Sequence, residues 1–341
     1  MPDDLPPPPR PPRSQTVPEF VRDIKDTADR LLADGISRGE AKLLSTALRE
    51  LRYAFKVFSK YRGQRKVTVF GSARTKPDHP TYAMAKEFSK QMAAKNFVTV
   101  TGAGGGIMEA GHVGAGRDMS LGLNILLPFE QSANSVMTGT DRLMTMRYFF
   151  TRKLMFVKET DAVALFPGGF GTHDEGFEAL TLMQTGKSHL FPIVMVDQPG
   201  GTYWKRFNDF IEHELLGNKL ISPADMCLYK VCASVEEAVA EVTNFYRVYH
   251  SMRFVKKDLI MRFTKPISDT TIAYVNQNYK DIIWEGAIER AEADPMEANE
   301  PELADYHRLR FKFDRHGHSR LRHMIDYINE AESGPEGKLD V

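Results

Sequence analysis

The chain has 341 residues, of which 45 are basic and 45 acidic, so its formal net charge is zero. This balance gives no global attraction to nucleic acid or membranes, and any such partner would have to bind a local patch. No apolar export segment begins the chain and no run approaches the roughly 18 apolar residues of a spanning helix, so we expect a soluble, cytoplasmic protein. Its two cysteines, Cys227 and Cys232, are too few for a disulfide scaffold and are expected to be buried, reduced thiols.

A proline-rich segment from Pro6 to Arg13 can adopt a polyproline conformation but cannot bury a core. Residues 1–18 are therefore predicted to form a flexible tail, with an SH3-type ligand as the alternative. Residues 19–63 are predicted to hold two helices, and the second begins with the capping box Ser37-x-x-Glu40. Its apolar stripe predicts a core or a dimer contact and comprises Leu44, Leu48, Leu51, Phe55 and Phe58.

Residues 64–250 alternate between apolar, β-prone runs and helical patterns. The predicted strands cover residues 66–70, 97–101, 121–127, 161–166, 191–196 and 226–231, with Pro128 ending the third. This alternation is typical of an α/β fold with a doubly wound, mostly parallel sheet and helices on both faces. Ligands of such sheets bind outside the carboxyl ends of the strands, so the turns at those ends form the candidate site.

Three glycine turns fall at these carboxyl ends: Gly71-Ser72-Ala73-Arg74, the run from Gly102 to Ala110, and Pro167-Gly-Gly-Phe-Gly-Thr172. Bare backbone N–H groups at the positive end of a helix favour phosphate. A dinucleotide-binding G-x-G-x-x-G from Gly102 would need glycine where Ile107 stands, so a mononucleotide-sized ligand fits better. The candidate binding residues in these turns are Gly71, Ser72, Gly104, Gly105, Gly106, Gly168, Gly169, Gly171 and Thr172.

One acidic and two basic side chains accompany the third turn. Glu175 lies one helical turn further on, so its carboxylate can reach over the same mouth. Arg152 and Lys153 precede the strand that leads into the turn and would balance the charge of a phosphate. The alternatives are that Glu175 only complements the helix dipole, worth roughly 0.3 to 1 kcal/mol, and that the two cations belong to a solvated helix face.

After residue 250 the pattern changes, and residues 251–341 are predicted to form a small α+β appendage of unknown role. Its predicted strands cover residues 257–264, 287–293 and 307–313, and its helices residues 269–283 and 316–329. The acidic stretch from Glu292 to Asp305 is predicted to be an exposed loop. A cluster of basic residues would suit a regulatory anion, RNA or a metal, but its spacing matches no standard ligand pattern and favours solvated charge. The cluster comprises Arg308, Arg310, Arg315, Arg320, Arg322, His307, His316, His318 and His323.

The pair Arg152-Lys153, followed by Pro167-Gly-Gly-Phe-Gly-Thr-x-x-Glu175, resembles the signature of the LOG family. These are the cytokinin riboside 5′-monophosphate phosphoribohydrolases, long labelled lysine decarboxylase-like. The resemblance covers about residues 64–250. It implies a Rossmann-like fold, a homodimer or larger homo-oligomer, and cleavage of a nucleoside 5′-monophosphate such as AMP to free base and ribose 5-phosphate, with no cofactor and no metal.

Carried over by position, the resemblance makes Arg152 and Glu175 the catalytic residues and the third glycine turn the phosphate loop. The chain departs from the family pattern at three places. Phe149-Phe150 replaces the Met-His of short plant-type members, Ala103 interrupts the middle glycine run, and His173 stands where an aliphatic residue is usual. These changes bear on the preferred base more than on the reaction.

The residues are consistent with that chemistry, because loss of a base leaves positive charge on the ribose that a carboxylate stabilises. At roughly 4 Å and an effective dielectric near 20 this attraction is about 4 kcal/mol. Arg152 is expected to fix the substrate and Glu175, and Glu109 is a candidate for contact with the ribose. One rival is a non-catalytic nucleotide- or phosphorylated-cofactor-binding protein, similar to the molybdenum-cofactor carriers. Another is a pyridoxal-phosphate decarboxylase with Lys153 as its Schiff base.

Overall fold

The computed structural model describes residues 16–127, 133–298 and 300–333. The proline-rich segment from Pro6 to Arg13 and Pro128 lie outside these residues. The flexible tail predicted for residues 1–18 is wrong at its end, where Val17 and Pro18 belong to the first helix. The chain divides into two compact units, one up to Arg52 and one from Tyr53 onward. Helix α1 (Val17–Ala33) and most of α2 (Arg38–Phe58) form the first unit. No helix in the described ranges is both long and apolar enough to cross a membrane.

The second helix starts as its sequence predicts. The N–H of Ser37 donates to Glu40 Oε2 at 2.9 Å, and the N–H of Glu40 donates to Ser37 Oγ at 3.3 Å. This reciprocal pair is the capping box that satisfies two otherwise unpaired helix donors. The apolar stripe on α2 differs in burial along its length. Leu44 and Leu48 are exposed, whereas Phe58 is buried in the second unit.

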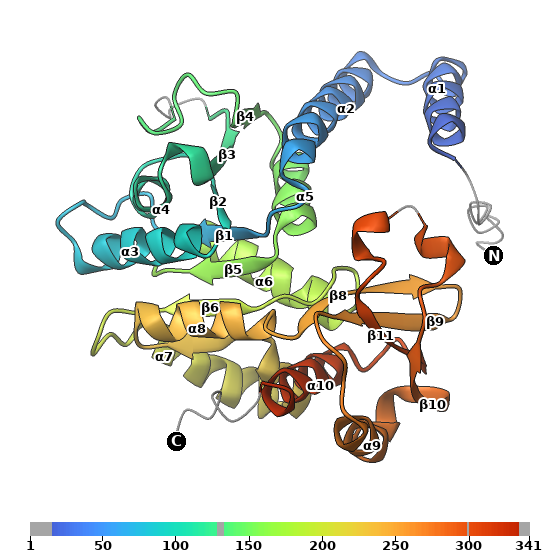
Figure 1. Ribbon diagram of the computed structural model, residues 1–341. Helices are drawn as coiled ribbons and strands as arrows, with labels where there is room; N and C mark the ends of the chain where they lie inside the picture. Colours follow the sequence, from blue (N-terminus) through green and yellow to red (C-terminus); the bar gives the residue numbers. More distant parts are fainter. Residues whose placement is uncertain (1–15, 128–132, 299, 334–341) are drawn as a thin grey trace. The chain divides into compact units, whose positions relative to one another are not determined.

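A seven-stranded parallel sheet forms the centre of the second unit (Figure 1). Its order is β4-β3-β2-β1-β5-β6-β7, and every neighbouring pair is parallel. The strands are β1 (Lys66–Phe70), β2 (Val98–Thr101), β3 (Ser120–Ile125), β4 (Leu143–Met146), β5 (Ala162–Leu165), β6 (Ile193–Val196) and β7 (Lys230–Cys232). The predicted doubly wound α/β fold is therefore confirmed. The strand order reverses between β1 and β5, and this switch point is where such sheets bind ligands.

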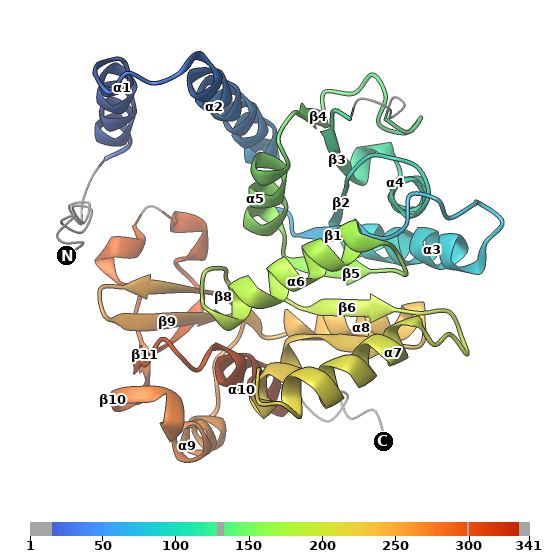
Figure 2. The same ribbon diagram turned by 180° about the vertical axis from the view of Figure 1, so that it is seen from behind.

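Helices cover both faces of the sheet. On the face seen in Figure 1 lie α3 (Pro80–Ala94), α4 (Ile107–Ala115) and α8 (Val235–Phe245). On the face seen in Figure 2 lie α5 (Phe149–Glu159), α6 (Phe170–Gln184) and α7 (Tyr203–Phe210). Alternate residues of β5 enter the two cores: Ala162 and Ala164 pack with the first group, Val163 and Leu165 with the second. Strands apolar on both faces are the rule for a covered parallel sheet.

A smaller antiparallel sheet follows, in the order β10-β11-β9-β8. It is built from β8 (Tyr249–Val255), β9 (Asp258–Phe263), β10 (Ile283–Ala291) and β11 (His307–Phe313), with α9 (Asp269–Asn278) and α10 (His318–Ala331). The predicted α+β appendage is confirmed. One hydrophobic cluster contains both Ile193 of the large sheet and Met261 of the small one, so the two sheets share a continuous core.

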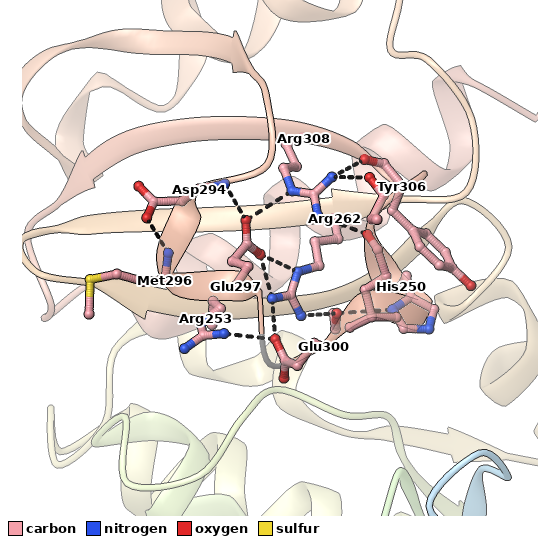
Figure 3. A network of polar contacts seen from close by, with 12 residues as sticks. His250, Arg253, Arg262, Asp294, Met296, Glu297, Glu300, Tyr306 and Arg308 are labelled. Carbon is pink, nitrogen blue, oxygen red and sulfur yellow. Dashed lines mark hydrogen bonds and ion pairs between the residues drawn. The ribbon is translucent and has the colours of Figure 1, made fainter. Parts of the chain in front are cut away.

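The acidic stretch of the appendage is not an exposed loop throughout, because Glu297 is 4% exposed (Figure 3). Its carboxylate accepts hydrogen bonds from Arg262 Nε at 2.7 Å, Arg308 Nε at 3.0 Å and the Asp294 N–H at 3.0 Å. The prediction of solvated charge is therefore wrong for Arg308, and it is also wrong for Arg322, which is buried against Glu241 at 2.8 Å. In the described parts of the chain, no group of three or more His, Cys, Asp or Glu side chains is placed to hold a metal ion.

The strand predictions missed two strands and misplaced one. Strands β4 and β8 were not predicted, although β8 pairs with β9 as a hairpin. The strand predicted for residues 226–231 is wrong in its first half, where a 3-10 helix runs from Pro223 to Leu228. A capping box between Ser222 and Asp225 starts that helix and delays the strand to Lys230.

Candidate active site

The three glycine turns meet at the switch point of the large sheet. The N–H of Ser72 donates to Pro167 O at 3.2 Å, and the N–H of Ile107 donates to Ser72 O at 3.0 Å. Gly106 has a φ of +62°, and a Cβ there would lie 2.3 Å from Ser72 O. Only glycine can make this approach, so the middle turn packs directly on the first one.

A cavity of about 620 Å³ opens above these turns. Its polar lining comprises backbone of the three turns with the side chains of Asn124, Arg152, Thr172 and Glu175, and the rest of its lining is largely apolar. The described residues that line the cavity are Phe70, Gly71, Ser72, Ala73, Arg74, Gly102, Gly104, Met108, Asn124, Ile125, Leu127, Phe149, Arg152, Phe156, Gly169, Phe170, Gly171, Thr172 and Glu175.

The N-terminus of α6 faces this cavity through Gly169, its N-cap residue, and through Gly171 and Thr172. A Cβ added to Gly169 or Gly171 would have no atom within 4 Å, so both glycines border open space. A Cβ added to Gly168 would lie 2.1 Å from Thr172 Oγ1, so that glycine is closely packed. Unpaired N–H groups and the positive end of the helix dipole make this terminus suitable for an anion.

Glu175 lies on the first turns of α6 and is only 6% exposed. Its Oε1 is 3.9 Å from Arg152 Nη2, and its Oε2 is 3.7 Å from Lys153 Nζ. Both cations come from α5, so the charge pair bridges the two helices that border the cavity. A Cβ built on Gly102 would lie 3.7 Å from Arg152 Nη1, so the guanidinium also reaches the middle turn.

Burial raises the pKa of Glu175 from its ordinary value of 4.5 to about 7, although Lys153 and Arg152 act to lower it. Desolvation disfavours the charged carboxylate, and neither cation is close enough to form a short hydrogen bond with it. A carboxyl group with a pKa near 7 can exchange protons at physiological pH, which suits general acid–base chemistry.

Lys153 is held by carboxylates of α6 and does not line the cavity. Its Nζ lies 2.9 Å from Asp174 Oδ2 and 3.1 Å from Glu178 Oε2. Burial acts to lower the pKa of Lys153, but Asp174, Glu175 and Glu178 outweigh it and raise the pKa above its ordinary value. The ammonium form is therefore favoured, whereas a Schiff-base lysine needs its neutral amine.

The structure brings together most of the predicted site residues. Eight of them line the cavity: Gly71, Ser72, Gly104, Arg152, Gly169, Gly171, Thr172 and Glu175. Gly106 and Gly168 lie beneath it and let the turns pack closely. Gly105, Glu109 and Lys153 do not line it.

Several cavity residues were not predicted to belong to the site. Arg74 is the last residue of the first turn, Asn124 is the penultimate residue of β3, and Met108, Phe149 and Phe156 supply apolar lining. The rule that places ligands at the carboxyl ends of strands would have identified Arg74 and Asn124. No comparable signal marks the apolar residues, since a Met or Phe on a helix is usually part of the core.

Ala103, which interrupts the middle glycine run, adopts a left-handed φ of +58°. This conformation is uncommon for a residue with a Cβ. It is held by the hydroxyl of Thr101, which accepts from the Ala103 N–H at 2.9 Å, and by the Asn134 N–H, which donates to Ala103 O at 2.8 Å. The turn thus keeps a backbone shape suited to glycine despite the substitution.

Comparisons with known proteins agree with this site. Residues 103–242 match the model of a family described as possible lysine decarboxylase. A cytokinin riboside 5′-monophosphate phosphoribohydrolase from Rhodococcoides fascians is 31% identical over 106 residues, which is 31% of this chain and 52% of that protein. The matched stretch thus spans about half the length of that relative.

Solved structures also show similarity over about half of the chain. The molybdenum cofactor carrier protein of Chlamydomonas reinhardtii is 20% identical, with a TM-score of 0.36, and covers 53% of this chain and 96% of its own. The DNA processing protein A of Helicobacter pylori is 12% identical, with a TM-score of 0.37, and covers 52% of this chain and 79% of its own.

The family match includes Arg152, Lys153 and the whole glycine motif up to Glu175. The resemblance of this chain to the LOG, or lysine decarboxylase-like, family is therefore confirmed over residues 103–242.

Proposed function

We propose that the protein hydrolyses the N-glycosidic bond of a nucleoside 5′-monophosphate, such as AMP or a cytokinin riboside monophosphate, to a free base and ribose 5-phosphate. The observation that carries this proposal is the buried Glu175 carboxyl group beside an anion-binding helix terminus. The family resemblance and the activity named for the Rhodococcoides fascians relative support it.

The position of the α6 N-terminus in the cavity orients the substrate. The phosphate would bind the N–H groups at the start of α6, above β5 and β1. Strands in a sheet are spaced about 4.8 Å apart, so β3 lies roughly 14 Å from β5. This distance suits the length of a nucleotide, and the base would therefore lie on the β3 side of the cavity, near Asn124, Ile125 and Leu127. The apolar side chains of Ile125 and Leu127 favour a planar base over a second charged group.

The reaction breaks the bond between C1′ and the base nitrogen, with the electron pair leaving on the base. Glu175 is the only carboxyl group among the described residues that line the cavity. As a carboxylate it stabilises the positive charge that develops on the ribose, and its pKa of about 7 lets it accept a proton from the attacking water. That water forms the new bond to C1′, the departing base takes a proton from solvent, and Glu175 returns its proton to solvent.

Arg152 fixes this arrangement. Its guanidinium faces Glu175 at 3.9 Å and stacks near the rings of Phe149 and Phe156, at 5.1 and 5.6 Å. A binding protein without catalysis would gain nothing from Glu175, because a buried carboxylate repels a phosphate and is itself expensive to desolvate. The raised pKa of Lys153 likewise disfavours a Schiff-base mechanism.

Incubation with AMP, GMP, CMP, UMP and a prenylated AMP, followed by chromatography of the free bases, tests the proposal. Glu175→Gln should reduce turnover about thousandfold while leaving nucleotide binding largely intact. Glu178→Gln is the matched control, because Glu178 lies on the same helix and also binds Lys153 but does not line the cavity. Equal turnover by E175Q and the unmodified protein would exclude the mechanism.

A further inference from the structure

A tyrosine and a histidine lie behind the phosphate loop. Tyr203, the first residue of α7, donates its hydroxyl proton to Gly168 O at 2.5 Å. His173 Nε2 lies 2.6 Å from the same hydroxyl. A carbonyl oxygen only accepts, so the single phenol proton belongs to the bond with Gly168, and His173 Nε2–H donates to the tyrosine. The chain of donors thus runs from His173 through Tyr203 to the loop.

The direction of the Gly168 carbonyl fixes the direction of the next N–H. In a planar trans peptide the C=O and the following N–H point to opposite sides. When Tyr203 binds Gly168 O, the N–H of Gly169 is turned away from Tyr203. Gly169 lines the active-site cavity, whereas Tyr203 and His173 line a separate cavity of about 560 Å³ that shares no lining residue with it.

We propose that Tyr203, braced by His173, is a positioning residue that holds the Gly168–Gly169 peptide with its N–H toward the substrate phosphate. A peptide between two glycines rotates easily, because neither residue has a Cβ to restrict it. A flipped peptide would present its carbonyl oxygen to the phosphate and repel it. This inference rests on the proposed function and identifies what keeps the anion site in its binding form.

Further contacts hold the side chains of Tyr203 and His173 in place. The N–H of Tyr203 donates to Asp197 Oδ2 at 2.8 Å, which fixes the start of α7. The His173 ring stacks on Tyr203, with centroids 5.8 Å apart, and meets the edge of the fully buried Trp204 at 5.7 Å.

Tyr203→Phe tests the proposal, because it removes the hydroxyl and keeps the ring. The expected result is about tenfold weaker binding of ribose 5-phosphate and AMP, with adenosine binding unchanged. The KM for AMP should rise by the same factor with little change in kcat, as for an interaction made equally in the ground and transition states. His173→Leu should give a smaller effect of the same kind, since Tyr203 keeps its bond to Gly168.

Tyr229→Phe is the matched control, because Tyr229 packs in the same aromatic cluster but donates to Asn208 at 2.7 Å, away from the loop. Equal ribose 5-phosphate binding by Y203F and the unmodified protein would overturn the proposal. So would an equal loss of adenosine and AMP binding, which indicates a general structural defect. If AMP is not cleaved but Y203F still loses phosphate binding selectively, the hydrolase function fails and the positioning role stands.

Discussion

Two glutamates of this protein, Glu175 and Glu297, are almost equally buried, and each faces two cationic side chains. Around Glu297, Arg262 and Arg308 approach to 2.5 and 3.0 Å. Around Glu175, Arg152 and Lys153 stay at 3.9 and 3.7 Å. The first carboxylate has close, directed hydrogen bonds, whereas the second has attraction without them.

This difference in geometry, together with the greater depth of Glu175 beneath the protein surface, reverses the effect on protonation. Burial acts to raise the pKa of Glu297, but the Asp294 N–H and Arg262 outweigh it, and the pKa is lowered. Burial of Glu175 prevails over its two cations, and the pKa rises to about 7. Counting nearby charges therefore does not separate a structural ion pair from a reactive group. The hydrogen bonds to the carboxylate and its depth of burial do.

The largest expected effect is on the structural side of the comparison. Glu297→Ala should lower the free energy of unfolding by roughly 3 to 5 kcal/mol, because the buried Arg308 loses the carboxylate that it contacts and the buried Arg262 keeps only that of Glu300. Urea denaturation at pH 7 measures this loss. Glu302→Ala, in an exposed position of the same stretch, should change stability by no more than about 0.5 kcal/mol. A similar small change for E297A would remove the distinction between the two glutamates.

Glu175→Gln should act in the opposite direction and stabilise the protein at pH 8. The folded pKa is above the unfolded one, so the folded state loses stability as pH rises from 4.5 through about 7. Removing the titrating group should recover up to ~3 kcal/mol at pH 8 and almost nothing at pH 4.5. Thermal unfolding at both pH values checks the prediction, with Glu236→Gln, at an exposed position of α8, as the control. Destabilisation by E175Q at pH 8 would contradict the raised pKa.

The rate of AMP cleavage should follow the ionisation of Glu175. Because the carboxylate is the active form, kcat/KM should rise about tenfold per pH unit below pH 7 and level off above it. Initial rates from pH 5.5 to 8.5 measure the profile. A profile that is flat across pH 7 would show that Glu175 does not titrate in the reaction.

The smallest expected effect comes from one of the two cations. Lys153→Met removes an attraction that lowers the pKa of Glu175, so the midpoint of the pH profile should move to higher pH. Activity at pH 7 should fall a few-fold and recover in more alkaline solution. Lys158→Met, an exposed lysine on the same helix, is the control. The shift separates titration of Glu175 from that of the substrate phosphate, whose pKa near 6 is independent of the variant.

Much of the large sheet follows from the sequence, because buried parallel strands are short apolar runs with glycine or proline at their ends. Arg152 and Glu175 could be placed at one site because both flank the same strand and its turn. Strand β4 escaped prediction because Leu143-Met-Thr-Met146 at the edge of the sheet is neither a clear apolar run nor a clear alternation. The helix that replaces residues 226–228 of a predicted strand depends on a local cap, which outweighs β-propensity.

The properties that distinguish Glu175 could not be predicted from spacing. Its burial depends on α5 and on turns that are far away in sequence, and its pKa depends on distances of a few ångströms. The same holds for Glu297, which belongs to an acidic, proline-containing stretch typical of exposed loops. Its partners Arg262 and Arg308 lie on adjacent antiparallel strands, in register with one another. Only that pairing places both guanidinium groups around one carboxylate.

The position of β1 limits how far this protein can be trimmed. The family match begins at residue 103, after both β1 and β2, yet these strands lie in the middle of the sheet between β3 and β5. A fragment cut to the matched boundaries would lose its two innermost strands together with the turn that contains Ser72. The β4-β3 pair and the β5-β6-β7 strands would then have no strand between them to join them into one sheet. Truncation experiments should therefore retain the chain from Lys66 onward.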